Sequence, residues 1–186
     1  MTRTERGFRL VFWGLVFVVL DIHLDESVNL LPDFVGFILV TVGLGRLVTL
    51  SGRFRAARVL AAMLIVLSLA DFSDLVREEG APWLDGWRVL EIFVDVVDVA
   101  MVWLLCGGIV ALAKAHELPD LRYRAETRRG LYVGFQVASW IVLFAMKDAP
   151  EPPVALFVGM FVFAVVVMLL LMGLMLRAGR ELGEVA

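Results

Sequence analysis

The feature that most constrains this sequence is an unbroken apolar run, PVALFVGMFVFAVVVMLLLMGLML, at residues 153–176. A helix needs about 20 such residues to cross the roughly 30 Å hydrocarbon core of a bilayer, so the run predicts a membrane-spanning helix. The rest of the chain agrees, because 61% of the 186 residues are hydrophobic and the mean hydropathy is +0.88. A soluble domain contains roughly 45–50% apolar residues. We therefore expect a polytopic membrane protein.

Five further segments are apolar enough to be predicted as spanning helices. The six predicted spans are residues 8–25, 32–50, 58–76, 88–112, 131–147 and 153–176. The first and third are short in apolar terms because Asp21 and Asp71 interrupt them, so the arginines at their other ends must extend towards the interface. No loop has room for a separate soluble domain. The prediction is an all-α bundle of six spans, with residues 1–186 as a single transmembrane domain.

Basic residues are distributed unevenly between the two sets of loops. Fourteen of the seventeen lysines and arginines fall at the N-terminus, in the second and fourth loops and at the C-terminus. Cytoplasmic loops carry an excess of lysine and arginine, so both termini are predicted to be cytoplasmic. The fourteen are Arg3, Arg6, Arg9, Arg46, Arg53, Arg55, Arg58, Lys114, Arg122, Arg124, Arg128, Arg129, Arg177 and Arg180. Anionic lipid headgroups are expected to attract the basic loops on this side.

Composition and motifs exclude several classes of protein. The net charge of −3 argues against a nucleic-acid binder, which is usually strongly basic. Cys106 is the single cysteine, so no intramolecular disulfide or cysteine metal cage can form. His23 and His116 are predicted to lie on opposite sides of the membrane, which excludes a site with several histidines. The sequence contains no catalytic or phosphate-binding motif, so no catalytic residue and no cofactor are predicted.

The fourth predicted span carries a row of charged residues. Arg88, Glu91, Asp95 and Asp98 fall within about 80° of one helix face. Asp98 is sixteen residues before Lys114, so it lies about 24 Å along the helix from that cytoplasmic anchor. An acid near the bilayer centre costs roughly 2.5–3.5 kcal/mol to insert. This face is therefore expected to contact other helices or a water-filled cavity.

Two other predicted spans bring acids to a similar depth. Asp21 and Asp71 lie roughly 18–20 Å along their helices from the basic cytoplasmic ends. Three helices thus place carboxylates in the outer third of the membrane, where Arg88 and Lys147 are the principal candidate counter-charges. Positive groups are outnumbered, which leaves room for a bound cation or for protons.

Three functions remain open on these residues. The first is cation- or proton-linked transport or binding through an acidic pocket in the outer leaflet, although the residues do not identify a metal. The second is a non-catalytic membrane scaffold or accessory subunit, in which Arg88 or Lys147 pairs with the acids and locks the bundle. The third is an intramembrane hydrolase with an aspartate dyad. The predicted pocket residues are Asp21, Asp71, Glu91, Asp95 and Asp98.

Small residues in two spans predict close helix packing. Gly36 and Gly43 are seven residues apart on one face, and Cys106, Gly107 and Gly108 are consecutive. The segment around the first of these, NLLPDFVGFILVTVGL, resembles an LPDF-x-G segment of small uncharacterised bacterial multi-pass membrane proteins. The resemblance covers about 30 residues. It implies a bacterial inner-membrane protein and assigns no functional residue.

Overall fold

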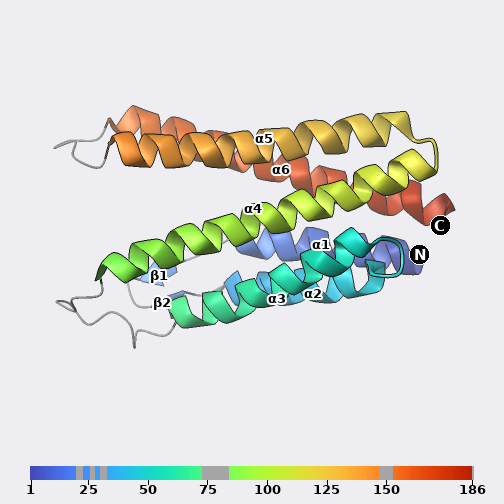
Figure 1. Cartoon of the computed structure of the whole chain (residues 1–186), viewed down its shortest axis with the longest axis horizontal. Helices are drawn as coiled ribbons and strands as arrows, with labels where there is room; N and C mark the ends of the chain where they lie inside the picture. The colour runs from blue at the N-terminus through green and yellow to red at the C-terminus, as the bar shows by residue number, and fades with distance from the viewer. Residues whose placement is uncertain (20–22, 26–27, 30–32, 73–83, 147–152, 186) are drawn as a thin grey trace.

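The chain folds into a bundle of helices, seen in a computed structural model that describes residues 1–19, 23–25, 28–29, 33–72, 84–146 and 153–185 (Figure 1). The fold class is all-α, as predicted, apart from one short antiparallel pair of strands in which His23 lies opposite Asn29. The helices are α1 (Arg3–Val19), α2 (Asp33–Leu47), α3 (Gly52–Phe72), α4 (Leu84–Ala115), α5 (Pro119–Ala145) and α6 (Val154–Val185), and the strands are β1 (His23–Asp25) and β2 (Val28–Asn29).

Each helix packs against its neighbours in sequence, and α6 also packs against α1, which closes the bundle. Figure 1 shows α1, α2 and α3 on one side, α5 on the other, and α4 running obliquely between them. Both termini lie at the same end of the bundle, together with the α2–α3 and α4–α5 turns (Figure 1). The basic residues that predicted a common side for both termini are therefore gathered at one end.

Glycines bring α1 and α2 into backbone contact. A Cβ on Gly14 would lie 2.6 Å from the carbonyl oxygen of Gly36, and a Cβ on Gly36 would lie 2.7 Å from the carbonyl oxygen of Gly14. Gly43 meets the carbonyl oxygen of Gly7 in the same way, at 2.7 Å. The predicted packing role of Gly36 and Gly43 is confirmed, because a side chain at either position would force the helices apart.

The core of the bundle runs from α1 through α3 to α4. The rings of Phe8 and Phe54 meet edge to face, with their centroids 5.9 Å apart. Gly108 on α4 leaves the space that Phe54 occupies, since a Cβ there would lie 2.5 Å from the ring. Cys106 on α4 is a buried free thiol. The prediction that Cys106, Gly107 and Gly108 serve packing is confirmed for Cys106 and Gly108.

One predicted span was too long, and two helices extend beyond their predicted spans. The first was extended to residue 25, but α1 ends at Val19 and His23–Asp25 form β1. The fifth was begun at residue 131, but α5 begins at Pro119, so the basic segment before it belongs to the same helix. Asp120 near its start and Pro119 in its first turn suit a helix N-terminus. The sixth continues past residue 176 to Val185.

Two helices of the described chain are long and apolar enough to cross a membrane, Ile92–Ala115 within α4 and Val154–Val185, which is α6. The α2 segment Phe34–Leu47 is apolar but shorter. Only 11% of the most apolar part of α6 is buried within the chain. Large side chains such as Phe161, which is 70% exposed, therefore need an apolar environment outside the bundle.

Candidate functional site

The acidic face of α4 contacts α5. The indole Nε1 of Trp140 donates a hydrogen bond of 2.9 Å to Oδ2 of Asp95. The hydroxyl of Tyr132 donates a hydrogen bond to Oδ2 of Asp98. Because α4 is one continuous helix, the two aspartates lie on the same face, one turn apart. The arrangement joins the two helices at two levels, with an acceptor on α4 and a donor on α5 at each level.

The donors on α5 come from a single helical stripe. Tyr132, Gln136 and Trp140 are spaced four residues apart and so share one face. Neither Tyr132 nor Trp140 was predicted from the sequence as a partner of the acids. The four-residue spacing of polar side chains within an apolar helix is the signal that points to them. Tyr132 is 6% exposed, whereas Asp95 and Asp98 are half-buried.

Both donors are electrically neutral. Within the described residues, no lysine or arginine forms an ion pair with Asp95 or Asp98. A partly buried carboxylate needs hydrogen-bond donors to replace the water that it loses, and the indole and phenol groups supply one each. The pair therefore satisfies part of the hydrogen-bonding capacity of each carboxylate and leaves its negative charge without a described counter-charge.

The side chains of the other predicted site residues lie outside the part of the chain that the structure describes. Asp21 and Lys147 lie outside the described residues. Asp71 lies near the end of α3, and Arg88 and Glu91 lie in the first part of α4, but their side chains are outside the description. No group of three or more acidic, histidine or cysteine side chains suited to a metal occurs among the described residues.

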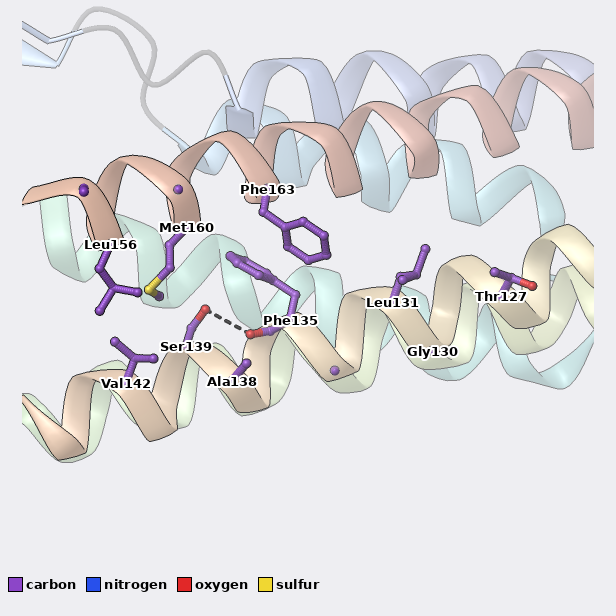
Figure 2. A pocket seen from close by; sticks show the side chains of 13 residues that line it. Thr127, Gly130, Leu131, Phe135, Ala138, Ser139, Val142, Leu156, Met160 and Phe163 are labelled. Carbon is purple, nitrogen blue, oxygen red and sulfur yellow. Dashed lines mark hydrogen bonds between the residues drawn. The ribbon is translucent and has the colours of Figure 1, made fainter.

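A groove of about 770 Å³ separates α5 from α6. Its walls are apolar, and Figure 2 shows Phe135 of α5 and Phe163 of α6 pointing toward one another across it. Their ring centroids are 5.6 Å apart. The hydroxyl of Ser139 donates to the carbonyl oxygen of Phe135 at 3.0 Å, so it is satisfied within its own helix (Figure 2). The groove thus offers mainly hydrocarbon to an occupant.

Arginines gather where α5 and α6 approach the basic end of the bundle. Arg177 Nη2 lies 2.5 Å from Oδ2 of Asp120, and Arg124 Nε lies 3.2 Å from the same oxygen. The hydrogen bond from Arg124 and the charges of both arginines hold the pKa of Asp120 below its ordinary value. Arg177 also pairs with Glu181. The exposed carboxylate of Asp120 therefore links the start of α5 to the last turns of α6.

Arg128 differs from these paired arginines. Its Nη1 is buried without a hydrogen-bond partner among the described residues, and it faces Gly173 of α6. Burial lowers the pKa of Arg128, and the nearby charges of Arg124 and Arg177 lower it further. An unpaired buried donor of a charged group is costly. This site therefore favours an anion.

Two more arginines hold α3, α4 and α5 together. Arg53 Nη1 donates a hydrogen bond of 2.6 Å to the carbonyl oxygen of Gly107. The guanidinium of Arg129 lies 4.0 Å from the centre of the Trp103 ring, which is a cation–π contact. Gly107 lets Arg53 approach closely, since a Cβ there would lie 3.3 Å from Arg53 Nη1, whereas Arg129 Nη1 at 3.8 Å would be in ordinary contact with it.

Comparison with known proteins identified no relative of this chain: no family model, no curated protein and no solved structure matches it.

Proposed function

We propose that this chain is a multi-pass integral protein of a bacterial inner membrane that acts as a non-catalytic scaffold or accessory subunit. In this proposal α1 to α6 are six spanning helices, and both termini are cytoplasmic. The support is the apolar composition, the exposed apolar face of α6 and the gathering of basic residues at one end of the bundle. The assignment to a bacterial inner membrane is supported by the resemblance of the LPDF-x-G segment to bacterial multi-pass membrane proteins.

One observation carries the scaffold role. Asp95 and Asp98, the two predicted pocket residues with described side chains, each accept a hydrogen bond from α5. A carboxylate held in this way contributes to helix association, because lipid offers neither donors nor acceptors in competition. The acids of α4 then fix the position of α5 and, through it, the exposed surface of α5 and α6 that partners or lipids contact.

A specific observation also favours a second candidate, cation or proton binding. The donors to Asp95 and Asp98 are neutral, so a cation or proton can balance the carboxylate charge. Ionisable groups within a membrane helix often mark such pathways. In this candidate Asp21, Asp71 and Glu91 complete the outer-leaflet pocket.

Ion flux into proteoliposomes separates the two candidates. The purified chain is reconstituted and tested with protons, sodium, potassium, magnesium and calcium, beside empty vesicles. The scaffold role predicts flux equal to that of empty vesicles for every ion. Flux that an Asp98→Leu, Tyr132→Phe double variant abolishes would contradict the scaffold role and support the second candidate, provided that the double variant unfolds at the wild-type temperature.

A further inference from the structure

The groove between α5 and α6 is kept open by glycine. A Cβ added to Gly130, Gly134 or Gly159 would meet no atom within 4 Å. These glycines differ from Gly14 and Gly36, where the opposing backbone fills the space. A glycine costs about 1 kcal/mol in a helix relative to alanine, and here no contact inside the chain offsets that cost. The open space is suited to an occupant from outside the chain.

The dimensions and walls of the groove fit a hydrocarbon chain. It extends along α5 from Thr127 to Val142, which is about 22 Å of helix. One leaflet of the hydrocarbon core is roughly 15 Å thick, half of the whole. Leu131, Phe135 and Met160 give the walls their apolar surface. The groove is therefore longer than one leaflet is thick, so an acyl chain of a single leaflet can lie along α5 within part of it.

Arg128 lies at the basic end of the α5 face that carries Phe135. It precedes Phe135 by seven residues, so the two side chains leave the helix within about 20° of one another. The half-buried guanidinium has a free Nη1, whereas Asp120 already pairs Arg124 and Arg177. Arg128 does not line the groove itself, but it adjoins Thr127, which lines the end of the groove on the predicted cytoplasmic side.

We propose that the groove binds an anionic phospholipid of the cytoplasmic leaflet, with one acyl chain beside Gly130, Gly134 and Gly159 and the phosphate at Arg128. The proposal rests on the membrane location proposed above. Charge complementarity and the apolar walls both support this occupant, since a headgroup phosphate pairs with arginine and an acyl chain fills an uncharged groove. A helix from a second copy would fill the groove but would leave Arg128 without an anion.

Lipid binding to the full-length chain tests the proposal. The protein is purified in detergent, and native mass spectrometry measures its affinity for phosphatidylglycerol, phosphatidylcholine and inorganic phosphate. Both lipids offer a phosphate to Arg128, but the cationic choline of phosphatidylcholine cancels its charge. Phosphatidylglycerol should therefore bind about fivefold more tightly than phosphatidylcholine, the factor that one basic residue near an anionic headgroup supplies. Arg128→Gln should remove this preference. Arg122→Gln should preserve it, because Arg122 on the same helix pairs with Glu126.

A second pair of variants tests the groove itself. Gly134→Leu fills the open space and should weaken binding of both lipids by about tenfold or more. Val137→Leu adds bulk to α5 outside the groove, where Val137 is 43% exposed, and should leave binding unchanged. Unaltered lipid binding by Gly134→Leu would overturn the proposal. Equal losses of the phosphatidylglycerol preference in Arg122→Gln and Arg128→Gln would also overturn it. So would inorganic phosphate that binds as tightly as phosphatidylglycerol. A wild-type dimer that dissociates in Gly134→Leu alone would show that a second copy occupies the groove, which would also overturn the proposal.

The lipid site and the membrane location can fail separately. A chain that remains monodisperse in water without detergent would contradict the membrane location. A chain that needs detergent, yet binds phosphatidylglycerol and phosphatidylcholine equally, would overturn the lipid site alone.

Discussion

The hydroxyl of Tyr132 donates a hydrogen bond to Oδ2 of Asp98 and so joins α5 to α4 across a separation of 34 residues. Tyr132 is 6% exposed, which keeps water from replacing the phenol as the donor. Its partner is a carboxylate in an apolar helix of membrane-spanning length. Asp98 belongs to the charged row that the sequence offered as a candidate site, and in the structure it takes part in helix packing.

Tyr132→Phe should destabilise the bundle. The change keeps the ring and removes the hydroxyl, which leaves Asp98 without this donor. Loss of a hydrogen bond to a charged group costs about 1.5–3 kcal/mol, or about 3–12 °C in melting temperature for a chain of this size. Thermal unfolding in detergent measures the shift. Tyr123→Phe is the matched control, because Tyr123 is 68% exposed, and it should leave the melting temperature unchanged.

Removing both partners should cost less than removing one. In the Asp98→Leu background, Tyr132→Phe no longer strands a carboxylate, so its effect on the melting temperature should fall to near zero. Replacing both members of a buried hydrogen bond with apolar groups is nearly neutral. A double-mutant cycle gives the coupling. Additive effects of the two single changes would mean that the two side chains do not depend on each other.

Glycines of the two kinds should respond oppositely to alanine. Gly36→Ala places a methyl group against the backbone of α1 and should lower the free energy of unfolding by about 1–3 kcal/mol. Gly134→Ala points into open space and should raise it by up to about 1 kcal/mol through helix propensity. Denaturation of both variants beside the wild type makes the comparison. A Gly36→Ala protein as stable as the wild type would contradict the close contact of α1 and α2.

Acidification should weaken the link between the start of α5 and the end of α6. The folded pKa of Asp120 lies below its ordinary value, so its stabilising contribution is present above about pH 4 and is lost as the pH falls through the folded pKa. In Asp120→Asn this acid-dependent loss should be smaller. Melting temperature measured from pH 6 down to pH 3 tests the sign. An identical slope for the variant and the wild type would remove Asp120 from the account.

Much of the bundle could be predicted from hydropathy and charge. The run at residues 153–176 predicted α6, and Gly36 and Gly43 predicted a packing face, because both depend on local patterns. Helix ends were predicted less well. The sequence before residue 131 appears as a basic loop by composition, yet Pro119 begins a helix there that Arg122 and Glu126 stabilise by pairing one turn apart.

The sequence predicted the acids of the candidate site but not their hydrogen-bond partners. Asp95 and Asp98 stand out because carboxylates are costly in an apolar helix, but their partners depend on which face of α5 turns towards α4. Nothing local to Tyr132 or Trp140 fixes that rotation, which tertiary packing decides. The groove was not predicted, since the sequence does not distinguish a glycine beside open space, such as Gly134, from one in a close helix contact, such as Gly36.

Membrane topology tests the central claim most directly. Reporter domains fused after Arg53, Gly80, Arg124 and Glu151 show on which side of the membrane each position lies. Six spanning helices with cytoplasmic termini predict inside, outside, inside and outside, in that order, because the basic segments remain in the cytoplasm. An outside signal after Arg124 would contradict the account, since it would move the start of α5 and the Arg128 region to the opposite face of the membrane.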